Sequence, residues 1–224
     1  MSEFVSPGSG YAVVEREPAE VMGRNLKMAS KLWASATAFF FFAFLFAYFY
    51  LRAVDKSSVF RPKHIDPSMT LGTLVMLAVV AGAVVVRLGL ADHRAGRQGS
   101  CRTKETGALV LLLAALVLQV VEWSSLGFGP TDGPYASVFI GWTGMQFLFL
   151  IGVTYWVETT VAMSMRYRGE RAAAAENASG DAERAAPDIE DPLSLLGPEL
   201  DAASFYAAFV AGLVVLAWVV LYLV

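Results

Sequence analysis

Long uninterrupted hydrophobic stretches, rather than short periodic ones, organise this chain. They cover residues 32–51, 69–86, 107–123, 135–157 and 203–224. Each is close to the roughly 20 residues that an α-helix needs to cross the hydrocarbon core of a membrane. Charged and proline-containing segments separate them. The pattern therefore predicts an all-α integral membrane protein, built as a bundle of five transmembrane helices.

Composition supports this prediction. Of the 224 residues, 56% are hydrophobic and only 17% are charged, a balance typical of membrane proteins. The first 26 residues carry four glutamates and no apolar core followed by small residues. We therefore expect no cleavable signal peptide there.

The distribution of basic residues predicts the orientation. Thirteen of the 17 lie in the N-terminal segment and in the second and fourth connections, and the other four lie in the first connection. Positively charged loops stay in the cytoplasm. We predict a cytoplasmic N-terminus and an external C-terminus.

The segments outside the hydrophobic stretches suggest a simple domain organisation. Residues 1–26 are expected to form a cytoplasmic tail, and residues 27–224 the transmembrane domain. An acidic cytoplasmic linker is predicted at about 168–201, because residues 176–201 hold eight acidic residues and one basic residue. The basic connection at 87–105 is expected to be a loop.

Polar residues within the spans are costly in hydrocarbon, so they are the first candidates for function. Gln119 and Glu122 are three residues apart on the third span and share a face. Three roles stay open for Glu122: a hydrogen bond with Gln119 that fixes packing, a pair with Arg52, and contact with a lipid head group or a partner subunit. Gln146 lies about one turn after Thr143 on the fourth span, and this pair is expected to set helix register.

Small residues recur every four positions on two of the spans. They are Ser204, Ala208 and Gly212 on the last span, and Ala78 and Gly82 on the second. Such spacing permits close approach of helix backbones in membranes. We predict that these residues pack helices against one another.

The inventory of reactive side chains is sparse. His64 and His93 are both placed in connecting loops, and Cys101 is the single cysteine. A haem, copper or zinc site needs such side chains in suitable geometry. We therefore expect no catalytic residue, no metal and no cofactor site in this chain, and no nucleic-acid partner.

Three stretches resemble, in order, segments of cytochrome c oxidase subunit III of the haem–copper oxidases. They are LWASATAFFFFAFLFAYFYLRA at 32–53, LQVVEW at 118–123 and YASVFIGWTGMQFLFLIG at 135–152. The resemblance covers most of residues 28–224, in a diverged short form with five helices. Six residues of this chain match the family's motifs by position, and they are Arg52, Gln119, Glu122, Ser137, Thr143 and Gly144.

The chain also departs from the family pattern. Thr37 stands where the family usually has a glutamate, and Gln146 and Phe149 stand where it usually has two histidines. On the last span, Ala207, Ala208 and Ala211 replace a tryptophan, a histidine and an aspartate. Whether the family's lipid-holding and proton-entry groups survive here stays open.

The resemblance implies an accessory, non-redox subunit III of a bacterial haem–copper terminal oxidase in the plasma membrane. Catalytic subunit I, subunit II and membrane lipids would be its partners, and haem and copper would lie in the catalytic subunit. Bound phospholipid is expected as well. The candidate lipid or inter-subunit contacts are Arg52, Gln119, Glu122, Thr143 and Gln146. A related subunit of a nitric oxide reductase and a small membrane transporter are the alternatives.

Overall fold

The computed structural model describes residues 19–55, 60–62, 65–178 and 193–224, and these contain helices but no strands. The helices are α1 (Ala19–Val54), α2 (Met69–Arg94), α3 (Gln98–Ser124), α4 (Pro134–Ala178) and α5 (Leu193–Trp218), and α5 continues into a short π-helix, η1 (Val219–Leu223). Five helices in this part of the chain are long and apolar enough to cross a membrane. The predicted all-α class, with five helices suited to span a membrane, is confirmed for the described residues, while the orientation of the termini stays a prediction.

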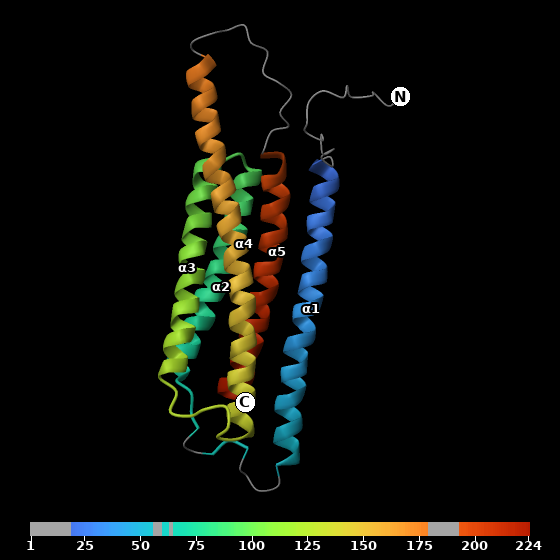
Figure 1. Ribbon diagram of the computed structural model, residues 1–224, viewed down its shortest axis with the longest axis vertical. Coiled ribbons are helices and arrows are strands. Elements are labelled where there is room, and N and C mark those ends of the chain that lie inside the picture. The colour runs from blue at the N-terminus through green and yellow to red at the C-terminus, as the bar shows by residue number, and fades with distance from the viewer. Residues whose placement is uncertain (1–18, 56–59, 63–64, 179–192) are drawn as a thin grey trace, which may run out of the picture.

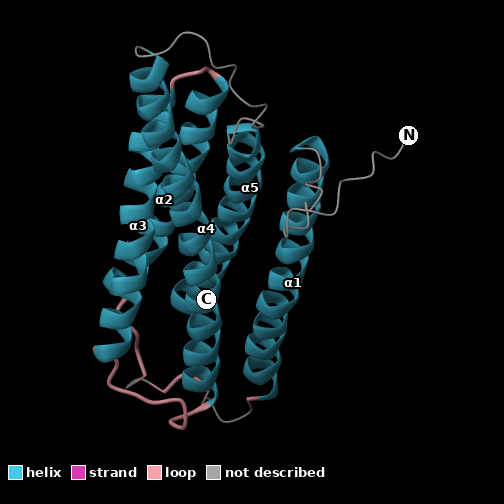
Figure 2. Ribbon diagram, turned by 45° about the horizontal axis from the view of Figure 1, so that its top comes forward, coloured by secondary structure: helices cyan, strands magenta, loops and turns pink. Residues whose placement is uncertain are grey.

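The helices lie side by side along the long axis of the molecule, with α1 and α3 at opposite edges (Figure 1). α1 packs mainly on α5, and α2 packs on both α3 and α5. The turn between α2 and α3 lies at the end of the bundle where α1 and α5 begin (Figure 2). We call this the α2–α3 end. The opposite end, where α3 passes into α4, is the α3–α4 end.

Local sequence signals explain where several helices start and stop. The Ser68 hydroxyl accepts a hydrogen bond from the Leu71 amide and so caps the start of α2. Gly96, with a φ angle of 74°, ends the same helix, because this left-handed conformation favours glycine. Pro134 is the first residue of α4, where a missing N–H costs nothing.

The helices extend beyond the hydrophobic stretches. Only residues 95–97 separate α2 from α3, so the loop predicted at 87–105 is wrong, and His93 lies in the last turn of α2 rather than in a loop. A hydrophobic stretch marks the part of a helix that is buried in hydrocarbon. The hydrogen-bonded backbone continues past it as long as the residues favour helix.

The predicted tail and linker are partly helical. α1 begins at Ala19, inside the predicted tail, while α4 continues to Ala178 and α5 starts at Leu193, both inside the predicted linker. The rest of these two segments, residues 1–18 and 179–192, lies outside the described residues, as does His64. The division into tail, membrane domain and linker therefore stays a prediction.

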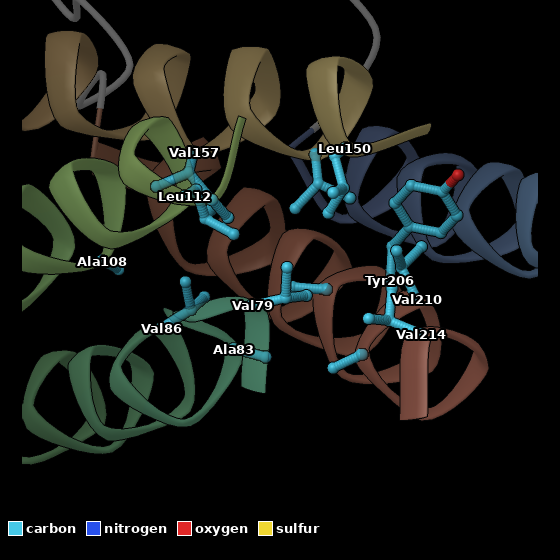
Figure 3. Packing of buried hydrophobic residues seen from close by; sticks show 14 of the residues in the cluster. Val79, Ala83, Val86, Ala108, Leu112, Leu150, Val157, Tyr206, Val210 and Val214 are labelled. Atoms are coloured by element: carbon cyan, nitrogen blue, oxygen red, sulfur yellow. The ribbon is translucent and has the colours of Figure 1, made fainter. Parts of the chain in front are cut away.

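The main core consists of alanine, valine and leucine side chains, together with Tyr206, and nearly all of them come from α2, α3, α4 and α5 (Figure 3). Val79, Val86, Leu112 and Leu150 are each at most 1% exposed. Gly82 is buried beside Leu112, because a Cβ atom added there would come within 3.1 Å of the leucine. The predicted packing role of this small residue on α2 is confirmed.

The small residues of α5 behave differently from the prediction. Ser204 is buried, but Ala208 and Gly212 are exposed at the surface of this chain. Four residues turn an α-helix by about 400°, so positions spaced by four drift about 40° per step around the helix. The prediction that Ala208 and Gly212 pack helices within this chain is wrong, since the stripe has turned away from the core.

A second core cluster near the α3–α4 end is rich in aromatic rings from α1 and α4. Successive residues of an α-helix are about 100° apart, so the four side chains of Phe39–Phe42 point in different directions. Phe41 is fully buried against Trp142, with the ring centres 6.2 Å apart, whereas Phe39 is 78% exposed. Only one side of α1 belongs to the core.

Candidate functional site

Four of the five predicted site residues line one small cavity towards the α3–α4 end. Gln119 and Glu122 come from α3, and Thr143 and Gln146 come from α4. Their exposed fractions are 1, 1, 3 and 5%, so all four are buried inside this chain. Their burial favours a packing role, while contact with lipid or with another subunit stays a prediction.

The Glu122 carboxylate receives hydrogen bonds from two sides. The Gln119 amide nitrogen donates to Glu122 Oε2 over 2.8 Å, and the Tyr222 hydroxyl in η1 donates to Oε1. Gly72 of α2 lies against the Tyr222 ring, which would overlap any Cβ at that position. The predicted hydrogen bond with Gln119 is confirmed. We call Gly72, Gln119, Glu122 and Tyr222 the Glu122 cluster.

Thr143 and Gln146 share the cavity but have different roles. The Thr143 hydroxyl accepts from Trp123 Nε1 over 3.0 Å and donates to the Phe139 carbonyl over 2.8 Å. Trp123 of α3, rather than Gln146, therefore sets the register of α4 at this point. The cavity beside Gln146 measures about 10 Å³. Such a volume lies at the lower limit for one water molecule.

Arg52 lies apart from these four residues. Its guanidinium donates to the carbonyl oxygen of Val224 over 2.7 Å and joins the end of α1 to the end of the chain. Glu122 is instead bonded to Gln119 and Tyr222, so the pairing with Arg52 that we considered is wrong. The sequence placed Arg52 at the correct end of the bundle but not beside Glu122.

At the position where the resemblance leads us to expect a glutamate, two hydroxyl groups lie in contact with each other. Thr37 is fully buried on α1, and its Oγ1 lies 2.9 Å from the Tyr206 hydroxyl of α5. Figure 3 shows the Tyr206 ring with its oxygen turned towards α1. Thr37 also donates to the Trp33 carbonyl over 2.8 Å. This contact bonds α1 to α5 inside the hydrocarbon span.

Ser137 and Gly144, which also match the family's motifs by position, lie away from the cavity. Ser137 donates to the Pro130 carbonyl over 2.5 Å and holds the start of α4 to the preceding loop. A Cβ atom added at Gly144 would meet no atom within 4 Å. Neither residue contacts the Glu122 cluster through a hydrogen bond among the described residues.

Sequence reasoning missed a second buried carboxylate on α3. Glu105 is 1% exposed, and its Oε2 accepts from the Thr160 hydroxyl of α4 over 3.3 Å, while Oε1 has no hydrogen-bond partner among the described residues. Gly89 of α2 lies directly against Oε1. We call Gly89, Glu105 and Thr160 the Glu105 cluster.

A pattern in the sequence could have identified Glu105. Buried positions on α3 follow one another at spacings of three and four, which is one face of a helix. They are Cys101, Glu105, Ala108, Leu112, Ala115, Gln119 and Glu122. The two carboxylates thus stand on the same face, one at each end of an apolar segment. The interpretation of 87–105 as a loop hides this pattern, because it does not extend the buried face of the helix as far as Glu105.

Asp92 was also missed. It is 2% exposed in the last turns of α2, and it accepts hydrogen bonds from Lys104 over 2.5 Å, from Arg97 and from Ser100. These three donors lie on the turn and the first turns of α3. The buried carboxylate therefore closes the hairpin between α2 and α3, a role that hydropathy alone does not reveal.

These polar groups form hydrogen bonds between helices of this chain. Within the part of the chain that the structure describes, no three His, Cys, Asp or Glu side chains lie close enough to hold a metal ion. The two α3 carboxylates face helices α2, α4 and η1 of the same chain. Hydrogen bonds of this kind specify helix packing in a membrane more than they stabilise it.

Fold and buried polar groups together define a multi-pass α-helical membrane protein. No protein-family model matches the chain. Over 95 residues the chain is 32% identical to a protein named cytochrome c oxidase subunit 3 from Vanderwaltozyma polyspora. The aligned region is 38% of this chain and spans about a third, 33%, of that relative. The similarity supports a relation to the family that the sequence motifs indicated.

Proposed function

We propose that this chain is an accessory subunit III, without a redox centre of its own, of a bacterial haem–copper terminal oxidase. The observation that carries the proposal is the 32% identity with a cytochrome c oxidase subunit 3. The motifs at 32–53, 118–123 and 135–152 and the five apolar helices support it. The complex reduces oxygen in aerobic electron transport, and this chain stabilises it.

The partners in this proposal are the catalytic subunit I, subunit II and membrane lipids. Haem and copper reside in the catalytic subunit. α1 has an apolar surface for such a neighbour, since Phe39, Phe42 and Phe46 are 78, 55 and 70% exposed. Aromatic side chains at this exposure suit hydrocarbon or a neighbouring subunit and not water. The candidate contacts Arg52, Gln119, Glu122, Thr143 and Gln146 act, in this proposal, by holding the bundle in shape.

The spacing of the buried carboxylates favours a scaffold over a transporter. Glu105 and Glu122 are separated by 17 positions on α3, which corresponds to about 25 Å of helix. Between them the same face consists of Ala108, Leu112 and Ala115, all at most 1% exposed, before Gln119 is reached. A transporter or proton path needs polar groups that continue through the midplane. The proposed function requires no such path.

A pull-down of the tagged full chain in mild detergent tests the proposal. We expect a partner containing haem a, b or o, visible in a reduced-minus-oxidised spectrum, and oxygen consumption by the recovered complex. An unrelated tagged membrane protein from the same cells serves as the control and should recover no haem. A colourless, self-contained oligomer would contradict the proposal.

The activity of the recovered complex separates the two respiratory functions. Consumption of nitric oxide without consumption of oxygen would assign the chain to a nitric oxide reductase. Substrate flux into liposomes that contain this chain alone would instead indicate a transporter. Both results would overturn the oxidase proposal.

A further inference from the structure

A cavity of about 460 Å³ lies between α1, α4 and α5, away from the five site residues that the sequence predicted. Four aromatic side chains line it: Trp33 from α1, Tyr155 and Trp156 from α4, and Tyr206 from α5. Its lining residues on α1 and α5 belong to the parts of these helices nearer the α2–α3 end. Cavities of roughly this size, with aromatic walls and few polar groups, are typical of sites for small molecules.

The charge of this cavity is negative. Among the residues that line it, Glu199 is acidic and none is basic. Glu199 forms no ion pair among the described residues. The Trp156 indole nitrogen donates to Glu199 Oε2 over 2.8 Å, so the carboxylate is held against an aromatic wall. A ligand in this cavity is therefore bound most favourably if it carries a positive charge, because opposite charges attract.

The aromatic rings favour the same sign of charge. The Trp156 and Tyr206 rings lie beside each other, with their centres 6.0 Å apart. The Tyr206 hydroxyl is already paired with Thr37, so the polar tip of Tyr206 is turned towards α1 (Figure 3). Trp33 and Tyr155 are 56 and 66% exposed, so the cavity opens to the surface of this chain. The faces of such rings attract cations, and tryptophan attracts them most strongly.

We propose that this cavity binds a small organic cation of the alkylammonium class, with its charged nitrogen near Glu199 and its alkyl groups against Trp33 and Trp156. Aromatic rings are a common means of recognising quaternary ammonium ligands. A neutral molecule would leave the carboxylate without a counter-charge, and an anion would be repelled by it. The ammonium head group of a phospholipid fits less well, because its phosphate would lie close to Glu199. The proposal rests on this cavity and not on the oxidase function.

Binding of choline to the full chain tests this proposal. Choline is a small soluble quaternary ammonium ion, and 3,3-dimethylbutan-1-ol is its uncharged copy, with carbon in place of nitrogen. Both are titrated by ligand-observed NMR against the chain in an uncharged maltoside detergent, with protein-free micelles as the blank. We expect choline to bind about ten-fold more tightly than the alcohol, because only choline is attracted by Glu199 and by the faces of the rings.

The contribution of the carboxylate is tested by Glu199→Gln. Glutamine keeps an oxygen that accepts from Trp156 and removes only the charge. We expect this variant to bind choline about ten-fold more weakly and to bind the alcohol as the wild type does. Glu158→Gln is the matched control, since Glu158 is an exposed acid of α4 that does not line the cavity. It should bind choline as tightly as the wild type.

The aromatic wall and the open space of the cavity are tested separately. Trp33→Leu should weaken choline binding about five-fold, whereas Phe46→Leu, at an exposed ring of α1 outside the cavity, should leave it unchanged. Gly152→Leu should abolish binding, since Gly152 lines the cavity and a Cβ atom there would meet no atom within 4 Å. Gly107→Leu on α3, also in open space, is its control. The unfolding midpoint of both glycine variants, measured by circular dichroism, should stay unchanged.

Several results would overturn the proposal. Equal binding of choline and the alcohol would show that the cavity does not prefer a cation, and equal losses in the control variants would show that choline binds elsewhere. Phosphocholine bound as tightly as choline would assign the cavity to a lipid head group. Displacement of choline by an equal concentration of sodium chloride would indicate attraction of any cation. Gly152→Leu keeps the test valid if Glu199→Gln fails to fold, because the leucine enters open space.

Discussion

Glu122 and Glu105 stand on the same face of α3, both 1% exposed, yet their surroundings differ. Glu122 receives hydrogen bonds from Gln119 and Tyr222. Glu105 receives one from Thr160, and its second oxygen has no partner among the described residues. In each cluster a glycine of α2, Gly72 or Gly89, makes room for the polar group. The same helix pair thus buries one satisfied and one half-satisfied carboxylate.

The difference teaches that burial alone does not show what a polar residue contributes. A buried group whose partners are all present can specify packing, whereas one without a partner costs free energy wherever it lies. Removal of a partner from the Glu122 cluster should therefore destabilise the bundle by leaving buried groups unsatisfied, whereas a conservative change at Glu105 should have little effect. The free energy of unfolding in detergent, measured on single variants, tests this comparison.

The largest effect is expected at Asp92, which closes the hairpin end beside the Glu105 cluster. Asp92→Ala removes the shared acceptor of Lys104, Arg97 and Ser100, and we expect the free energy of unfolding to fall by more than in any of the variants below. Asp66→Ala is the control, because Asp66 forms an exposed pair with Arg61 worth at most about 1 kcal/mol. Equal losses in the two variants would show that Asp92 does not hold the hairpin.

Removal of the satisfied carboxylate should have the next largest effect. Glu122→Leu deprives Gln119 and Tyr222 of their acceptor, and we expect a loss of about 1–3 kcal/mol. Glu122→Gln keeps one oxygen and should lose less. A Glu122→Leu chain as stable as the wild type in denaturant titration would contradict the packing role of the cluster.

A small addition at Gly89 should reveal how closely α2 approaches Glu105. Gly89→Ala pushes against the Glu105 carboxylate, and we expect a loss of about 1–3 kcal/mol. The double variant Gly89→Ala with Glu105→Ala should recover part of this loss, a coupling that a double-mutant cycle measures. Gly107→Ala, in open space on α3, should be neutral or slightly stabilising.

The smallest effect is expected at Glu105 itself. Glu105→Gln keeps an acceptor for Thr160 and removes the need to bury a charge, so the free energy of unfolding should stay within about 1 kcal/mol of the wild type or rise. Denaturant titration in detergent measures this free energy, as it does for Glu122→Leu. A loss of more than about 2 kcal/mol would show that the second oxygen has a partner and would remove the contrast with Glu122.

Hydropathy was enough to predict the number of spans, since each hydrophobic stretch must lie in hydrocarbon. Hydropathy predicted the helix ends poorly, because His93 and Glu105 belong to helices that continue past their apolar parts. Within the candidate site, the spacing of Gln119 and Glu122 predicted their hydrogen bond. That Tyr222 completes this cluster, 100 positions later in the chain, has no local signal.

The sequence by itself determined the class of this protein, five membrane-spanning helices, together with motifs that resemble one subunit family. Hydrocarbon imposes these features residue by residue, because every apolar span must hydrogen-bond its own backbone. The tertiary structure decided which side of each helix is inside. The orientation of α5 about its own axis places Ala208 and Gly212 on the surface of this chain and the Tyr206 hydroxyl beside Thr37. Which side of a helix is buried depends on how whole helices pack against one another, so it cannot be predicted from a short stretch of residues.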